Sequence, residues 1–86
     1  MNRPALAPGV RLRVDEVRGR TVLLYPEGAL ALNATAAAVL ELCDGKRTLD
    51  EIETELRSRY GGADVRADVK RLLSRIAERG LLVGLS

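Results

Sequence analysis

The side chains that could carry acid-base, nucleophilic or metal chemistry are few in this sequence. Its 86 residues include no histidine and a single cysteine, Cys43, so the commonest proton shuttle, nucleophile pairs and zinc ligands are missing together. Cys43 lies within an apolar helical pattern, where a cysteine usually serves as a small buried hydrophobe. We therefore expect no catalytic residue, no metal site and no cofactor.

The carboxylates of the chain have the pattern of structural residues. Asp15 and Glu16 are neighbours in the sequence, as are Asp50 and Glu51, and adjacent side chains in a strand or helix point apart. A general acid or base has to lie within hydrogen-bond reach of the reacting group, which these pairs do not favour. No glycine-rich phosphate loop is present either. The sequence predicts a protein that is not an enzyme and that works by binding.

The length and composition predict one small domain with an aliphatic core. The chain has no Phe, no Trp and only two Tyr, and a chain of this length has room for a single core. One cysteine cannot close an internal disulfide, and no apolar run approaches the roughly 18 residues of a membrane span. We expect a cytoplasmic protein without a membrane segment, with an extended N-terminal arm over residues 1–9 and one domain over residues 10–86.

The beginning of that domain has the pattern of an antiparallel hairpin. Val10, Leu12 and Val14 alternate with charged residues, which is typical of a half-buried strand. A turn at residues 17–20 separates them from residues 21–25, which are β-branched and apolar enough to form the returning strand.

A third, short strand is predicted at residues 29–32, after a turn built on Pro26 and Gly28. Its sequence, Ala-Leu-Ala-Leu, contains no charge and no proline, whereas proteins usually protect an open sheet edge with such residues. This strand is therefore a candidate to accept an added strand from another chain. Two other interpretations stay open: its brevity alone protects it, or the apolar tail at residues 81–85 covers it.

Two helices are predicted next, each with a recognisable start. Asn33 is a candidate N-cap for a helix over residues 34–44. Thr48 and Glu51 have the spacing of a capping box, in which each side chain accepts a hydrogen bond from the backbone of the other. The helix that they open is expected to continue to Tyr60.

A third helix is predicted between Asp64, which we expect to be its N-cap, and Gly80. Its apolar residues recur with helical spacing, and basic residues occupy the rest of its circumference. The predicted fold is α+β, a three-stranded antiparallel sheet followed by three helices, similar to a winged helix-turn-helix.

This order of elements raises a DNA-binding winged helix as the alternative function. The last helix would then enter the major groove, with its Arg and Lys side chains meeting phosphates and base edges. A formal net charge of +2 is low for an affinity that depends on neutralised phosphates, and Asp64, Asp68 and Glu78 weaken the basic patch further. We therefore favour a peptide ligand and expect no nucleic acid partner.

A peptide added to the third strand would also need side-chain contacts. Ordering each ligand residue costs about 1–2 kcal/mol, whereas each new hydrogen bond contributes only about 1 kcal/mol. A cleft between this strand and the last helix could supply the rest, at about 1.5–3 kcal/mol for each buried aliphatic side chain. Arginines at its rim would favour an acidic peptide, and a solvated helix face is the alternative interpretation for them. The expected floor and rim are Leu30, Leu32, Val69, Leu72, Arg71 and Arg75.

With these residues assembled, the chain resembles the PqqD family of pyrroloquinoline quinone (PQQ) biosynthesis and, through it, the peptide recognition elements of ribosomally made, modified peptides. The resemblance covers nearly the whole chain and lies in the order and spacing of its segments, none of which is a catalytic signature. The segments are Pro8-Gly9-Val10-Arg11-Leu12, Arg18-Gly19-Arg20-Thr21-Val22-Leu23-Leu24, Pro26-Glu27-Gly28, Leu32-Asn33, Leu42-Cys43-Asp44-Gly45 and Thr48-Leu49-Asp50-Glu51-Ile52.

The resemblance implies a non-catalytic peptide chaperone. Such a protein binds the precursor peptide PqqA and presents it to PqqE, a radical S-adenosylmethionine (SAM) enzyme that crosslinks a Glu and a Tyr of that peptide. The resemblance also implies that the peptide lies along the third strand, in the groove beside the third helix. With the helix positions chosen by helical spacing, the expected peptide-binding residues are Ala29, Leu30, Ala31, Leu32, Val69, Arg71, Leu72, Leu73, Arg75 and Ile76.

Overall fold

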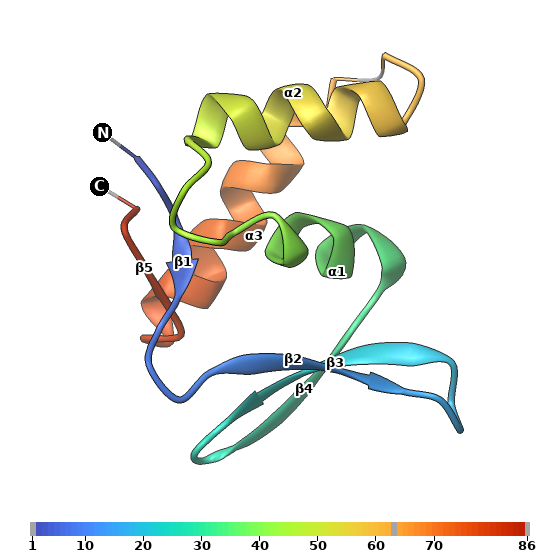
Figure 1. Ribbon diagram of the computed structural model, residues 1–86, viewed down its shortest axis with the longest axis vertical. Coiled ribbons are helices and arrows are strands. Elements are labelled where there is room, and N and C mark those ends of the chain that lie inside the picture. Colours follow the sequence, from blue (N-terminus) through green and yellow to red (C-terminus); the bar gives the residue numbers. More distant parts are fainter. Residues whose placement is uncertain (1, 63, 86) are drawn as a thin grey trace.

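The structure, a computed structural model, describes residues 2–62 and 64–85 (Figure 1). Its elements in chain order are β1 (Ala5–Leu6), β2 (Arg11–Asp15), β3 (Arg20–Tyr25), β4 (Gly28–Leu32), α1 (Ala34–Glu41), α2 (Leu49–Arg59), α3 (Arg66–Glu78) and β5 (Leu82–Val83). Strands β2, β3 and β4 form one antiparallel sheet in that order, and β1 pairs with β5 in a second. The predicted α+β fold, with three antiparallel strands and three helices, is confirmed.

The strand register explains how the sheet joins the core. Leu12 lies opposite Leu23, and Leu23 lies opposite Leu30, so one leucine from each strand stands on the same face of the sheet. Leu23 is fully buried, and the other two pack against the core. The three helices lie on this side of the sheet (Figure 1). We call it the inner face.

Val14 departs from the burial that its alternating pattern predicted. It shares the inner face with Thr21, its partner in the register, yet its side chain is 63% exposed. The turn between β2 and β3 extends beyond the helices (Figure 1), so nothing covers the end of this hairpin. The alternation predicted the direction of the Val14 side chain but not how far the helices reach.

Helix α1 begins as predicted and ends early. The Asn33 side chain accepts a hydrogen bond from the Ala36 amide at 2.7 Å, as an N-cap should. The predicted end at residue 44 is wrong, because α1 stops at Glu41. The amides of Leu42 and Cys43 bond to carbonyls three residues earlier, a tightening that is common in the last turn of a helix.

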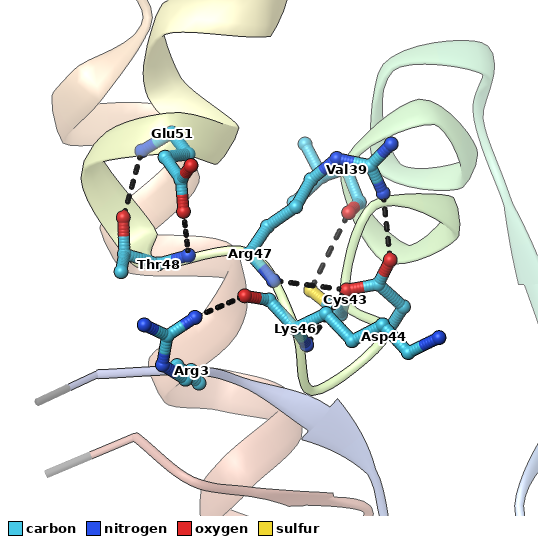
Figure 2. A network of polar contacts seen from close by, with 8 residues as sticks. All are labelled: Arg3, Val39, Cys43, Asp44, Lys46, Arg47, Thr48 and Glu51. Atoms are coloured by element: carbon cyan, nitrogen blue, oxygen red, sulfur yellow. Dashed lines mark hydrogen bonds and ion pairs between the residues drawn. The ribbon is translucent and has the colours of Figure 1, made fainter.

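The loop from α1 to α2 is held by polar contacts (Figure 2). The Asp44 carboxylate accepts hydrogen bonds from the amides of Lys46 and Arg47 at 2.9 and 3.1 Å. The capping box follows as predicted: the Thr48 amide donates to Glu51 Oε1 at 2.8 Å, and the Glu51 amide donates to Thr48 Oγ1 at 3.2 Å. This loop therefore fixes the start of α2 relative to the end of α1.

The predicted cap of the third helix is wrong. The N-cap of α3 is Val65, which makes no side-chain capping bond. The Asp64 carboxylate instead accepts a hydrogen bond from the Arg66 amide two residues later, at 3.1 Å. This short contact is typical of a turn formed by an Asp side chain, so Asp64 shapes the approach to α3 without capping it.

The N-terminal arm and the C-terminal tail pair with each other. Ala5 lies opposite Val83 in the β1–β5 ribbon, and the Arg3 amide donates to the Gly84 carbonyl at 3.1 Å. Arg3 also donates from its guanidinium to the Lys46 carbonyl (Figure 2). Because the tail pairs with β1, the interpretation in which it covers the third strand is wrong. Among the described residues, β4 pairs only with β3.

The core between sheet and helices is aliphatic, as expected. Its most deeply buried side chains are Leu23, Val39, Leu40, Ile52, Leu56, Val69 and Leu73. In the part of the chain that the structure describes, no helix has the length and apolar character needed to cross a membrane.

Candidate functional site

The sheet has two open edges within the described residues, β2 and β4. Strand β2 carries Arg11, Arg13 and Asp15, and charged side chains on an edge strand discourage pairing with another chain. Strand β4 carries only Gly, Ala and Leu. The edge of β4 is therefore the better candidate for an added strand.

The pairing of β4 indicates which of its backbone groups face outward. A two-residue loop separates the Tyr25–Gly28 pair, and antiparallel partners alternate between residues that exchange hydrogen bonds and residues that do not. Counting from this closing pair, Leu30 bonds to β3. The amides and carbonyls of Ala29 and Ala31 are then expected to point away from the sheet, where a guest strand would meet them.

A pocket of about 300 Å³ lies beyond the end of β4, between the three helices. Asn33, which directly follows Leu32 of β4, is one of its lining residues. We call this the helix pocket. Its lining is apolar inside and polar at the rim, and comprises Asn33, Thr35, Ala36, Val39, Leu56, Tyr60, Val65, Asp68, Val69, Arg71, Leu72 and Arg75.

The predicted site residues separate into three groups. Ala29 and Ala31 are exposed on β4, whereas Leu30 is half-buried and Leu32 is buried. Four helix residues line the helix pocket together: Val69, Arg71, Leu72 and Arg75. Leu73 and Ile76 are 0% and 2% exposed and belong to the core, so the structure places them where they support the site without lining it.

The sequence prediction did not include the contributions of α1 and α2 to the pocket. Thr35 and Val39 come from α1, and Leu56 and Tyr60 come from α2 or its C-cap. Leu56 is buried, whereas Tyr60, the C-cap of α2, is 40% exposed. The helical spacing could identify these residues as apolar but not as neighbours of α3.

The two arginines predicted at the rim differ in their surroundings. Arg71 Nη1 lies 3.1 Å from Asp68 Oδ1, and both side chains are well exposed. No ion pair of Arg75 is recorded within the described residues. An exposed pair of this kind contributes little to stability, but Asp68 partly neutralises Arg71. The positive charge available to an acidic ligand at this rim is therefore centred on Arg75.

Cys43 is placed as a packing residue. Burial, and secondarily the neighbouring charge of Asp44, raises the pKa of its thiol to about 12, and its Sγ donates to the Val39 carbonyl at 3.4 Å (Figure 2). A thiol in this state has little nucleophilic or metal-binding character. Over residues 2–62 and 64–85, no group of three or more His, Cys, Asp or Glu residues is placed to hold a metal ion.

The sequence matches a known family over most of its length. The family described as Coenzyme PQQ synthesis protein D (PqqD) matches residues 20–82. A Methylococcus capsulatus relative named PqqA binding protein is 41% identical over 75 residues, which are 87% of this chain and 81% of the relative. A bifunctional coenzyme PQQ synthesis protein C/D from Methylorubrum extorquens is 42% identical over 81 residues, which are 92% of this chain and 22% of that protein.

A solved structure agrees with these matches. The PqqD part of Methylobacterium extorquens PqqCD has a TM-score of 0.80 and 40% identity to this protein, covering 93% of this chain and 87% of that chain. It is described as a functional and stand-alone recognition element for ribosomally synthesized and post-translationally modified peptides (RiPPs). With the family matched over residues 20–82 and the same fold in a relative of this identity, the chain belongs to the PqqD family.

Proposed function

We propose that this protein binds the precursor peptide PqqA without catalysing a reaction and presents it to the radical SAM enzyme PqqE. The Methylococcus capsulatus relative and a second relative of similar identity are both named PqqA binding protein. These names support the choice of ligand. The site that we propose consists of the outward backbone of β4 and the helix pocket. In this proposal the recognition domain spans residues 10–86, with residues 1–9 as its N-terminal arm, of which β1 pairs with β5.

The observation that carries the proposal is the continuity of the two parts of the site. Leu32 ends β4 and Asn33 begins the lining of the helix pocket. A peptide strand that pairs with Ala29 and Ala31 and extends past Leu32 reaches the rim formed by Asn33 and Thr35. The backbone of the peptide is then held by the sheet edge, while its side chains enter the space between the helices.

The two parts have different energetic roles. Backbone pairing fixes the direction and register of the peptide, but its hydrogen bonds contribute only about 0.5–1.5 kcal/mol each. The apolar lining of Val39, Leu56 and Leu72 supplies affinity by burying an aliphatic or aromatic side chain, at about 1.5–3 kcal/mol. Arg75 favours peptides with an acidic residue near that side chain. We expect a dissociation constant in the micromolar range, which corresponds to a free energy of binding of about −8 kcal/mol.

The alternative of a DNA-binding winged helix gains no support from α3. Arg66 Nε lies 3.6 Å from Glu53 Oε2, and Arg71 is paired with Asp68. A helix that reads the major groove needs these cations for phosphates and base edges. Carboxylates of the chain itself partly neutralise them.

The test is calorimetric titration of the full chain with synthetic PqqA peptide and with a scrambled peptide of the same composition. We expect micromolar binding of PqqA only, a negative heat-capacity change from apolar burial and a shallow dependence on salt. Equal affinity for the scrambled peptide would contradict recognition of PqqA. Tighter binding to duplex DNA, with a steep linear fall of log K against log salt, would favour the alternative.

Presentation to the enzyme needs a separate measurement. Crosslinking of PqqA by purified PqqE is followed with and without this protein, and with the Leu72→Asp variant, which is expected to lose the peptide. We expect crosslinked product only with the wild-type chain. Equal product formation in its absence would leave peptide binding intact and reject presentation.

A further inference from the structure

The face of the β2–β3–β4 sheet opposite the inner face carries no helix (Figure 1). We call it the outer face. Because side chains alternate along a strand, the register that puts Leu12, Leu23 and Leu30 inside puts their neighbours outside. The outer face consists of three cross-strand rows: Arg11-Leu24-Ala29, Arg13-Val22-Ala31 and, beside the hairpin turn, Asp15-Arg20.

The centre of the outer face is apolar. Val22 and Leu24 are half-buried although they stand on the side of the sheet away from the core. Val17, in the adjoining hairpin loop, is 95% exposed. A depression of about 630 Å³ extends from Val22 and Leu24 to the hairpin turn, where its lining includes two carboxylates. Its lining residues are Arg13, Val14, Asp15, Glu16, Val17, Val22 and Leu24. Contiguous exposed apolar surface of this kind marks an interaction site more often than scattered single residues do.

The margin of the outer face is basic. Arg11, Arg13 and Arg20 are exposed, and no ion pair is recorded for them in the described part of the chain. The carboxylate of Asp15 lies on the same face, opposite Arg20 in the register, and accepts a hydrogen bond from the Arg18 amide at 3.3 Å. The positive charge of this face is therefore centred on Arg11 and Arg13. An apolar centre flanked by arginines is complementary to a protein surface with an apolar centre and acidic margin.

We propose that the outer face docks such a surface on the enzyme that receives the peptide. This inference rests on the proposed function. A peptide paired with β4 extends the same sheet, so its side chains alternate between the helix side and the outer face. A protein seated on Val22, Leu24 and Ala31 therefore touches the outward side chains of the bound peptide as well. The domain holds one face of the peptide strand and leaves the other face to the enzyme.

The experiment measures binding of purified PqqE to the full chain, with and without PqqA peptide, at two salt concentrations. The test variant is Arg11→Glu/Arg13→Glu, and the matched control is Arg57→Glu/Arg79→Glu, which changes the charge equally at exposed positions in α2 and at the C-cap of α3. Val22→Ser probes the apolar centre without a charge change. Peptide affinity is measured for each variant by calorimetry, and thermal melting confirms folding.

We expect the test variant to lose about tenfold or more in affinity for PqqE, with a reduced salt dependence, while its peptide affinity stays within about twofold of wild type. The control variant should bind PqqE as wild type does. PqqE affinity that is unchanged in the test variant, or lowered equally in the control, would overturn the inference.

Two further outcomes would also overturn it. One is a wild-type chain that binds PqqA but not PqqE. The other is a wild-type dimer that the Arg11→Glu/Arg13→Glu variant disperses without changing PqqE affinity, because the outer face would then bind a second copy of the chain. Failure of wild-type chain to bind PqqA is a different result and rejects the proposed function itself.

Discussion

Leu30 of β4 lies directly opposite Leu23 of β3, a residue with no exposed surface. This pairing anchors β4 to the core through its inner face. It also fixes which backbone groups remain for a ligand, because the residues on either side of Leu30 are expected to turn their amides outward. Strand β4 is therefore packed against the core through Leu30, while the backbone groups on its outer edge pair with no other strand of the described residues.

The first prediction concerns the outward amide of Ala31. Proline has no N–H, but it is tolerated on an edge strand where the N–H faces away from the sheet. Ala31→Pro should fold and should weaken peptide binding by about tenfold, through one lost hydrogen bond and the added ring. Calorimetry with PqqA measures the loss.

The opposite edge strand supplies the control for this experiment. By the same alternation, Val14 of β2 also turns its amide outward. Val14→Pro removes this amide from β2, the edge strand that carries Arg11, Arg13 and Asp15. This variant should bind PqqA like wild type. Equal losses in the two variants would mean that the peptide does not pair with β4.

A second prediction concerns the helix pocket. Leu72 is half-buried and lines it, so Leu72→Asp places a charge where an apolar ligand side chain is expected. Peptide affinity should fall by at least about tenfold, since leaving one aliphatic side chain exposed costs about 1.5–3 kcal/mol. Ala67→Asp adds the same charge at an exposed position of α3 outside the pocket lining and should leave affinity unchanged. A Leu72→Asp variant with wild-type affinity would contradict the site.

Third, the two arginines of the rim, Arg71 and Arg75, should contribute unequally to peptide affinity. Because Asp68 partly neutralises Arg71, Arg75→Ala should weaken an acidic peptide more than Arg71→Ala does, by about threefold against less than about twofold. Asp68→Asn should strengthen binding, because it leaves Arg71 available. Titrations at low and high salt check the assignment. A larger effect at Arg71 would show that the ligand displaces the ion pair.

Fourth, the capping box should make stability depend on pH. A backbone hydrogen bond from Thr48 holds the pKa of Glu51 below its ordinary value, and backbone hydrogen bonds from Lys46 and Arg47 do the same for Asp44. The unfolded chain then binds protons more readily than the folded one. This stabilisation is complete above the ordinary carboxyl pKa values and is lost as pH falls through the lowered ones.

The measurement is urea unfolding between neutral pH and the acid range. The free energy of unfolding should decrease on acidification, and Glu51→Gln should flatten part of that slope. Thr48→Ala should lower stability by about 0.5–2 kcal/mol at neutral pH. An unfolding free energy that rises on acidification would contradict the assignment of these two carboxylates.

Fifth, the β1–β5 ribbon should depend on Gly84. Its φ is +81°, and a Cβ built there would overlap the Arg3 carbonyl oxygen. Gly84→Ala should detach the ribbon and accelerate exchange of the Arg3 and Ala7 amides, which donate to the carbonyls of Gly84 and Leu81. Gly19 also has a positive φ, +64°, but a Cβ there meets nothing within 4 Å. Gly19→Ala should therefore cost only the backbone strain, about 1–2 kcal/mol. Similar exchange in both variants would mean that the close contact is not essential.

The local parts of this fold could be predicted from the sequence because their causes are local. The strand alternation around Leu12, the Asn33 cap and the capping box of Thr48 and Glu51 each depend on a few neighbouring residues. The predicted cap at Asp64 was wrong because an Asp side chain can also accept a hydrogen bond from the amide two residues later and so form a turn. The sequence does not distinguish such a turn from a helix cap.

The site was predictable only in part, because it is formed by segments that are distant in the sequence. Leu72 and Arg75 could be assigned to the groove side of α3 from helical spacing. Helical spacing does not tell which other helix lies opposite, so Val39 and Tyr60 were missed. Similarly, the pairing of β1 with the tail at β5 depends on the whole fold bringing the two ends together.

Hydrogen exchange of individual backbone amides, measured by NMR with and without PqqA peptide, tests the central claim most directly. If the peptide adds a strand to β4, the amides of Ala29 and Ala31 should exchange slowly only when peptide is bound, and those of Leu12 and Val14 on the opposite edge should not change. Protection confined to α2, with Ala29 and Ala31 still exchanging freely in the saturated complex, would contradict it.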